Sequence, residues 1–503
     1  MKEVKKKAQR KAGVLMPISA LPSTQGIGTL GASAYRFVDW LHSAGMKIWQ
    51  VLPLLPTGYG DSPYQSASSD ALNPYFIDLD LLAEEGLLLT EEYADIEWSA
   101  NVRRVDYSRQ FIHKIAVLRK AFARFERCGK DWRAFLKKGK YADFALFMAL
   151  KMKFNYAPWT EWPEPYKNCK GEGLDLTDLE EEILFWQFTQ FIFLKQWNAL
   201  HKYAKERGIS IMGDMPIYVS QDSVEMWKYR EKLFLLNGEG NSAFVAGVPP
   251  DAFSEDGQLW GNPVYNWAQM QADGYDWWKQ RIAYAFELFD SLRIDHFRAF
   301  DKFFVIPSEA ENAKEGEWRK GPGMDLFASL QEYEIIAEDL GIIDNGVRKL
   351  LRQTGYPGMK VLSFAFDGNP KNEYLPSNIK RKNCVAYTGT HDNQPLCAFL
   401  ESLDKNARRA LETTLEEECL SADVPYITET VEDECKTMIE LLMWSKANTV
   451  IFPMNDVLCM GEESRFNAPS TVSDKNWTFR FIEKDFGFKR AAWLKGLTKV
   501  YKR

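Results

Sequence analysis

The segment SLRIDHF, residues 291–297, is a short apolar run that ends on charged and polar side chains. It follows a stretch with helical periodicity, residues 275–289. A run of this length after a helix is typical of a buried strand in a parallel sheet. A charged residue at the end of such a strand lies at the sheet edge where α/β proteins place their binding sites.

Seven further segments have the same character, and most are separated by stretches with helical periodicity such as 33–43, 182–206 and 430–445. Alternating strands and helices predict a parallel sheet, and eight repeats predict an α/β fold of the (β/α)8 TIM-barrel type. The seven segments are residues 13–21, 47–54, 210–217, 333–340, 359–366, 383–391 and 449–458.

We therefore expect residues 1–503 to form a single barrel with insertions between its strands. The gap between the second and third predicted strands holds roughly 150 residues, far more than one crossover helix needs. Within it, residues 72–168 are charged, aromatic and helical in pattern, which predicts a mainly helical inserted subdomain. Residues 237–276 are rich in Gly, Pro and Asn, and we expect them to form a loop insertion at the barrel mouth.

The composition excludes several classes of function. The formal charge of −7 comes from 63 basic and 70 acidic residues spread along the chain, so we expect no nucleic-acid partner. No apolar run is long enough for a membrane helix, so we expect no membrane association. The seven scattered Cys residues form no C-x-x-C pair, which favours a cytoplasmic protein. The five His residues have no ligand spacing, so we expect neither a metal nor a cofactor.

Aromatic residues make up 14% of the chain, and several lie in polar loops. Sugars present flat C–H faces that pack on aromatic rings, so this content suits a carbohydrate-binding protein. A large core that holds many aromatic side chains explains the composition equally well.

Three acids follow predicted strands: Asp295 in RIDHFR (293–298), Glu338 in AEDLG (337–341) and Asp392 in TGTHDN (388–393). In a barrel these strand ends face a common mouth. Taken singly, each acid is more simply a helix cap or a salt bridge at the rim. Together they match retaining glycoside chemistry, in which one carboxylate attacks the anomeric carbon and a protonated one donates to the leaving oxygen. Arg293 beside Asp295 favours the ionised form of that carboxylate.

The arrangement of Arg293, Asp295, Glu338 and His391-Asp392 is similar to that of the α-amylase superfamily. Longer segments narrow the resemblance to the amylomaltases, the 4-α-glucanotransferases or disproportionating enzymes of glycoside hydrolase family 77. The resemblance spans nearly the whole chain and is weakest in the helical insertion. Its segments are GYGDSPYQS (58–66), GDMPIYV (213–219), GVPPD (247–251), GQLWGNP (257–263), YPGMK (356–360), RFNAP (465–469) and NW (476–477).

The resemblance implies a glycosyltransferase that moves α-1,4-glucan segments between maltooligosaccharides, with glucose or maltose as acceptor, through a covalent glucosyl-enzyme. It implies Asp295 as nucleophile, Glu338 as general acid/base and Asp392 as the carboxylate that holds the distorted donor sugar. A second glucan site is implied at Tyr59. The substrate-binding residues implied are Ser62, Tyr64, Asp214, Phe253, Gln258, Trp260, Arg293, Asp367, His391 and Asn467.

A transferase must exclude water and position the acceptor, so that a sugar hydroxyl outcompetes the solvent. We expect the 237–276 insertion to do this, with Phe253 and Trp260 packing on sugar faces. A rigid loop at the barrel rim without a catalytic role is the simpler alternative. Two departures from the family pattern occur here: Ala252 stands where many relatives have Tyr, and Gln394-Pro395 stands where small hydroxyl residues are usual.

Three other functions fit the sequence less well. An α-glucan hydrolase would use the same acids, and only the family segments argue against it. A glucan-binding protein with a lost active site predicts that one of Asp295, Glu338 or Asp392 is missing, yet all three are present. A phosphate-binding aldolase-like barrel would need a Schiff-base lysine or a Gly-rich phosphate loop near the last strands, and neither is evident in the sequence.

Overall fold

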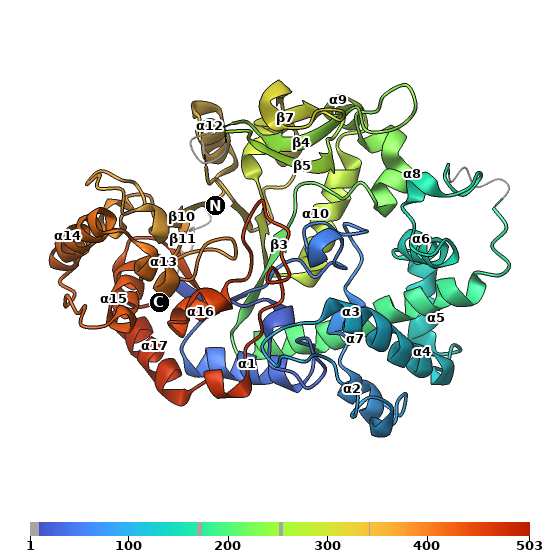
Figure 1. Ribbon diagram of the computed structural model, residues 1–503, viewed down its shortest axis with the longest axis horizontal. Helices are drawn as coiled ribbons and strands as arrows, with labels where there is room; N and C mark the ends of the chain where they lie inside the picture. Colours follow the sequence, from blue (N-terminus) through green and yellow to red (C-terminus); the bar gives the residue numbers. More distant parts are fainter. Residues whose placement is uncertain (1–9, 169–173, 251–254, 342) are drawn as a thin grey trace, which may run out of the picture.

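The computed structural model describes residues 10–168, 174–250, 255–341 and 343–503. Its centre is a sheet of eight parallel strands, which confirms the barrel predicted from the apolar runs (Figure 1). Around the sheet the order is β10 (Gly358–Val361), β11 (Cys384–Tyr387), β12 (Thr449–Pro453), β1 (Lys11–Leu15), β2 (Ile48–Gln50), β3 (Ser210–Met215), β6 (Ser291–Ile294) and β9 (Ile335–Ala337).

The barrel closes between β9 and β10. The backbone N–H of Ala337 donates to the carbonyl of Pro357 at 2.9 Å. The Asp339 side chain adds a second bond, because its Oδ1 accepts from the N–H of Met359 at 2.6 Å. The strands are short and buried on both faces, which is why each is a nearly continuous apolar run in the sequence.

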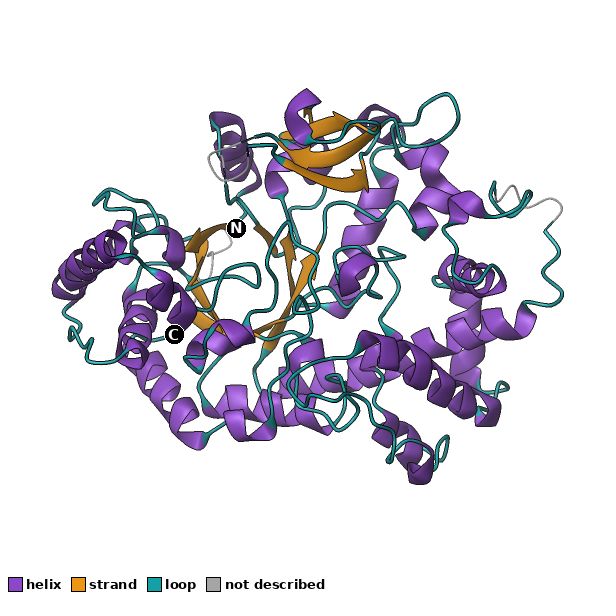
Figure 2. Ribbon diagram, in the orientation of Figure 1, coloured by secondary structure: helices purple, strands orange, loops and turns teal. Residues whose placement is uncertain are grey.

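Helices surround the barrel, as the purple and orange elements of Figure 2 show. The four segments with helical periodicity that were predicted form α1, α7, α10 and α15, each with bounds within two residues of the prediction. The outer helices are α1 (Ala32–Ser43), α7 (Glu180–Glu206), α10 (Asp276–Leu288), α12 (Asn345–Thr354), α13 (Leu396–Ser402), α14 (Lys405–Ala422), α15 (Val431–Trp444) and α17 (Phe488–Val500), with the short α11 (Met324–Phe327) and α16 (Met454–Val457). None of the helices that the described residues form is both long and apolar enough to span a bilayer.

The long segment between β2 and β3 packs along α7, at the right of Figure 1. Two glutamines of α7 anchor its start: Gln190 exchanges two hydrogen bonds with the backbone of Leu72, and Gln196 does the same with Asp78. Its helices are α2 (Leu79–Glu84), α3 (Tyr107–Arg109), the π-helical turn η5 (Gln110–Lys114), α4 (Ile115–Arg124), α5 (Lys130–Lys138) and α6 (Ala142–Lys153).

A second sheet lies beside the barrel mouth, at the top of Figure 1. It is antiparallel, in the order β5 (Gln258–Pro263), β4 (Phe244–Val248), β7 (Lys302–Pro307) and β8 (Glu317–Lys320). The helices α8 (Val224–Leu233) and α9 (Trp267–Ala272) flank β4 and β5 in the chain. The composition of residues 237–276 predicts a loop insertion, whereas the structure forms β4 and β5 within this segment.

Candidate active site

A cleft of about 740 Å³ opens at the carboxyl ends of the barrel strands, and Asp295, Glu338 and Asp392 all line it. Asp295 directly follows β6, Glu338 directly follows β9, and Asp392 lies in the loop after β11. The three acids that the sequence places on separate strand ends are therefore brought together. Asp295 and Glu338 directly follow strands, so the sheet holds their backbones in fixed positions.

Arg293 organises the charges beneath the cleft. Its Nη1 donates to both carboxylate oxygens of Asp214 at 2.7 Å, and its Nη2 donates to Oδ1 of Asp295 at 2.8 Å. The arginine and Asp214 are buried, whereas Asp295 is partly exposed to the cleft. Asp214 therefore does not line the cleft, although the sequence analysis expected it to bind sugar. It holds Arg293, which in turn orients the carboxylate of Asp295.

Glu338 lies in a different environment from Asp295. Its Oε2 accepts a hydrogen bond from the N–H of His296 at 2.7 Å, and its Oε1 accepts from the N–H of Leu340 at 2.8 Å. Burial, together with the nearby charge of Asp295, raises the pKa of Glu338 to about 8. Two acids in one cleft thus have contrasting surroundings: one is ion-paired with a guanidinium and the other is held protonated at neutral pH.

Residues of the segment after the last barrel strand, β12, donate hydrogen bonds to Asp392. Its Oδ1 accepts from Nδ2 of Asn467 at 2.7 Å, and Nη2 of Arg465 donates to its backbone carbonyl at 3.0 Å. Its other carboxylate oxygen lies 3.4 Å from Nε2 of His391. These partners fix the direction in which the Asp392 carboxylate faces the cleft.

Three rings form one wall of the cleft. Tyr64 stacks on His391 with ring centres 5.1 Å apart, and Trp477 lies 5.6 Å from Tyr64. The hydroxyl of Tyr64 donates to Oδ2 of Asp214 at 2.9 Å, which ties this wall to the charges below. Such a wall offers an apolar face to a sugar ring.

The second sheet supplies the opposite side through β5. Trp260 packs edge to face on His296 with ring centres 4.8 Å apart, and its Nε1 donates to Oε1 of Gln258 at 3.0 Å. His296 has a φ of +49°, a left-handed conformation that aims its N–H at Glu338. Burial lowers the pKa of His296 to about 4, so the imidazole is neutral. A tryptophan of the second sheet thus touches the residue that holds the buried acid.

The other predicted residues are distributed as follows. Ser62 lines the cleft, and Tyr59 lies at its rim with 76% of its surface exposed. Asp367 is exposed and is not among the residues that line the cleft. Phe253 and the departure at Ala252 lie outside the described residues. Among the residues that the structure describes, no group of three His, Cys, Asp or Glu side chains could hold a metal ion.

The structure adds three residues to which the sequence analysis gave no role: His296, Arg465 and Trp477. His296 is adjacent to Asp295, so its position in the chain was a usable signal. Arg465 and Trp477 lie within the family segments 465–469 and 476–477, but more than 70 residues separate them from Asp392. Nothing local predicts that Arg465 donates to the backbone of Asp392 or that Trp477 lines the cleft.

Comparison with known proteins identifies the family of this chain. The model of the 4-alpha-glucanotransferase family matches residues 16–484. The chain belongs to the 4-α-glucanotransferase family. A 4-alpha-glucanotransferase of Clostridium butyricum is 43% identical, covering 97% of this chain and 100% of the relative. A 4-alpha-glucanotransferase of Thermus thermophilus is 40% identical, covering 98% of this chain and 99% of the relative.

The chain is also similar to solved structures. The amylomaltase of Streptococcus agalactiae in complex with acarbose has a TM-score of 0.93 at 39% identity, covering 98% of this chain and 100% of that one. The amylomaltase of Corynebacterium glutamicum shares the fold, with a TM-score of 0.77 at 19% identity. The protein is thus a glycosyltransferase of the 4-α-glucanotransferase type, as the family segments predicted.

Proposed function

We propose that this enzyme transfers α-1,4-glucan segments between maltooligosaccharides by retaining double displacement. The observation that carries the proposal is the contrast between the two acids of the cleft. Asp295 is ion-paired with Arg293, whereas burial keeps Glu338 protonated at neutral pH. A nucleophile and a general acid require these two opposite conditions.

In the first step, a carboxylate oxygen of Asp295 forms a bond to the anomeric carbon of the donor. The bond from that carbon to the glycosidic oxygen breaks, and the electron pair leaves with the oxygen, which takes the proton of Glu338. The shorter glucan departs, and the rest of the donor is held on Asp295 as a glycosyl ester. Asp392, oriented by Asn467, is placed to bind hydroxyls of the donor sugar as its ring distorts.

In the second step, ionised Glu338 takes the proton from the 4-hydroxyl of an acceptor such as glucose or maltose. The acceptor oxygen forms a bond to the anomeric carbon, and the ester bond to Asp295 breaks. Asp295 returns as a carboxylate, and Glu338 is protonated again. Two inversions at one carbon leave the new linkage in the α configuration.

Water can attack the glycosyl ester in place of the acceptor, and the result is hydrolysis. A transferase must therefore favour attack by the acceptor hydroxyl over attack by water. The rings of Tyr64, Trp477 and Trp260 border the cleft from two sides and offer apolar faces for sugar rings. A bound acceptor that displaces water from these faces holds its hydroxyl near the reacting carbon, and such positioning outweighs the concentration of the solvent.

The covalent intermediate is tested with an α-maltosyl fluoride donor, whose leaving group needs no acid. In the Glu338→Gln variant the first step proceeds and the second lacks its base, so the glycosyl ester accumulates. Mass spectrometry of the digested protein should find the glycosyl mass on the peptide that carries Asp295. A β-configured product, or an adduct on another residue, would contradict the proposal.

A further inference from the structure

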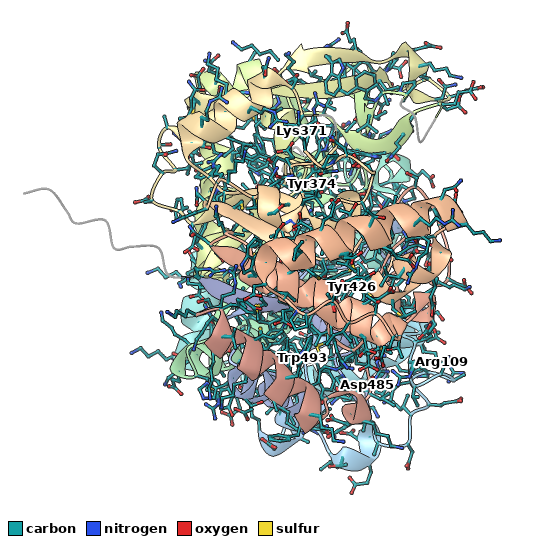
Figure 3. All side chains as sticks on the ribbon, turned by 90° about the vertical axis from the view of Figure 1, so that its left-hand side faces the viewer. Arg109, Lys371, Tyr374, Tyr426, Asp485 and Trp493 are labelled. Carbon is teal, nitrogen blue, oxygen red and sulfur yellow. The ribbon has the colours of Figure 1, made fainter. Side chains whose placement is uncertain are left out.

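A second recess of about 620 Å³ lies apart from the catalytic cleft, on the side of the barrel where α1 and α2 are drawn in Figure 1. The residues that line it have no member in common with the lining of the cleft. They come from the loop after β1, from α1, from the start of α2 and from residues 96–102 and 480–483. In Figure 3 the labels of Arg109 and Asp485 mark two segments that flank it: Arg109 pairs with Glu97 of its lining, and Asp485 pairs with Arg103.

The floor of this recess is a fixed polar network. Asp78 accepts from Oγ1 of Thr29 at 2.6 Å and from Nε2 of Gln25 at 3.3 Å. The π-helical turn η5 holds Gln25 from behind: Nε2 of Gln110 donates to its carbonyl and Nζ of Lys114 to its Oε1, both at 2.9 Å. Each of these five residues is more than nine-tenths buried. The floor is therefore rigid and polar, as a preorganised binding surface is.

Arg480 in the lining has unused hydrogen-bonding capacity. It is only 3% exposed, and its Nη2 donates to the carbonyl of Ser23 at 2.5 Å. Its buried Nε has no hydrogen-bond partner, and the guanidinium forms no ion pair within the described part of the chain. Burial lowers the pKa of Arg480 to about 10, a sign of its desolvation. Nη1 of Arg480 also has no hydrogen-bond partner among the described residues, and it is not among the buried unpartnered atoms, so an acceptor on an occupant of the recess can reach it and offset the cost of this buried cation.

The charges of the lining indicate which occupant fits. Four acids line the recess, Asp78, Asp80, Glu97 and Glu483, against two arginines, Arg36 and Arg480. Arg109 pairs with Glu97 and Arg36 pairs with Glu483, and the buried Lys114 lies near Asp78 and Asp80. Neither sign of charge therefore predominates around the recess, which favours neither an anion nor a cation. Neutral hydroxyl groups both donate to carboxylates and accept from guanidinium groups. We infer that this recess, which does not contain Tyr59, is a further binding site for an uncharged saccharide, a short α-glucan chain held mainly by hydrogen bonds.

The inference is tested by hydrogen exchange of the wild-type enzyme, with and without the glucan mixture that it forms from maltohexaose. Protection is expected in residues 22–33, 96–102 and 480–483, and separately in the cleft segment 388–394. Ala32 is exposed in the recess lining, so a tryptophan in its place should fill the recess. Ala32→Trp should therefore remove the protection of the recess segments and leave the protection of the cleft segment unchanged. Glu84→Trp adds the same ring at an exposed position of α2 outside the lining and should change neither.

Arg480→Met should raise the glucan concentration at half-protection of the recess about 10-fold, since a hydrogen bond to a charged group is lost. Protection confined to the cleft, or recess protection that survives Ala32→Trp, would overturn the inference. Protection of the recess by inorganic phosphate instead of glucan would overturn the ligand class. Because the cleft and recess segments are observed separately, a failure of glucan binding at the cleft is distinguishable from a failure at the recess.

Discussion

Nη2 of Arg293 donates a 2.8 Å hydrogen bond to Oδ1 of Asp295, and both residues come from the end of one strand, β6. The arginine is buried and also bonded to Asp214, so the direction of this bond is fixed before substrate arrives. The carboxylate that we propose as nucleophile is thereby ion-paired and oriented by a residue of the strand that it follows.

Replacement of Asp295 by Asn should lower the transfer rate by about 10³-fold or more, since the amide cannot form the glycosyl ester. The change is nearly isosteric, so the free energy of unfolding and the affinity for glucan should stay close to those of the wild type. Initial rates, thermal unfolding and glucan binding measure the three quantities. Substantial turnover by the pure variant would remove Asp295 from the role of nucleophile.

The pH dependence should report Glu338. Its pKa of about 8 in the free enzyme means that the acid form dominates below pH 8. The value of kcat/KM should therefore fall as the pH rises through about 8, because the leaving oxygen loses its proton donor. With an α-maltosyl fluoride donor the rate of the first step should no longer fall above pH 8, since fluoride leaves without a proton. If kcat/KM falls equally above pH 8 with both donors, the ionisation that causes the fall belongs to a group other than Glu338.

The separation of the two acids gives a structural prediction. In a substrate-bound structure the carboxyl groups of Asp295 and Glu338 should lie about 5–5.5 Å apart, as retaining enzymes require. A separation of roughly 6.5–9.5 Å would leave room for a water molecule and indicate inversion. Measurement in a crystal of the Asp295→Asn variant with bound maltooligosaccharide decides between them.

Trp260→Ala tests the role of the second sheet. The change removes a ring from the cleft and the contact with His296, and it should cost on the order of 1 kcal/mol in acceptor positioning. The ratio of free reducing ends to transfer products, measured with maltotriose, should therefore rise several-fold. Trp318→Ala is the matched control, because Trp318 lies on β8 of the same sheet, outside the cleft lining.

A lower rate at an unchanged ratio would mean that Trp260 only binds substrate and that water is excluded elsewhere. An unchanged rate and ratio would mean that Trp260 is a rim residue. The maltotriose assay also distinguishes transfer from hydrolysis, since transfer produces a ladder of longer chains and hydrolysis only shorter ones.

Asn467→Ala removes the 2.7 Å hydrogen bond to Asp392. A hydrogen bond to a charged group contributes about 1.5–3 kcal/mol, so kcat/KM should fall about 10-fold or more. The loss should appear mainly in kcat if Asp392 acts on the distorted sugar. Asn198→Ala, an exposed position on α7, serves as the control. Equal rates for both variants would show that Asp392 needs no help from Asn467.

The eight barrel strands could be predicted because they are buried on both faces and are therefore nearly continuous apolar runs in the sequence. The strands of the second sheet could not, since β8, Glu317–Lys320, reads EWRK and is largely exposed. The sequence pattern predicts that Asp295, Glu338 and Asp392 follow barrel strands, and these three acids lie close together because the carboxyl ends of barrel strands face one mouth. It did not predict that Asp214 is buried beneath Arg293, nor that Trp477 reaches Tyr64, because both depend on packing between distant segments.

The barrel closes at β9 and β10, immediately behind Glu338. A hydrogen bond from Ala337 to Pro357 and one to the Asp339 side chain join these two strands, whereas neighbouring pairs have regular ladders. Glu338 is nevertheless tied to the strand of Arg293, because its N–H donates to the carbonyl of Ile294 at 3.1 Å and its own carbonyl accepts from the N–H of Phe297 at 3.0 Å. The distance between the proposed acid/base and the proposed nucleophile is therefore set by the pairing of β6 with β9 and does not depend on how β9 meets β10.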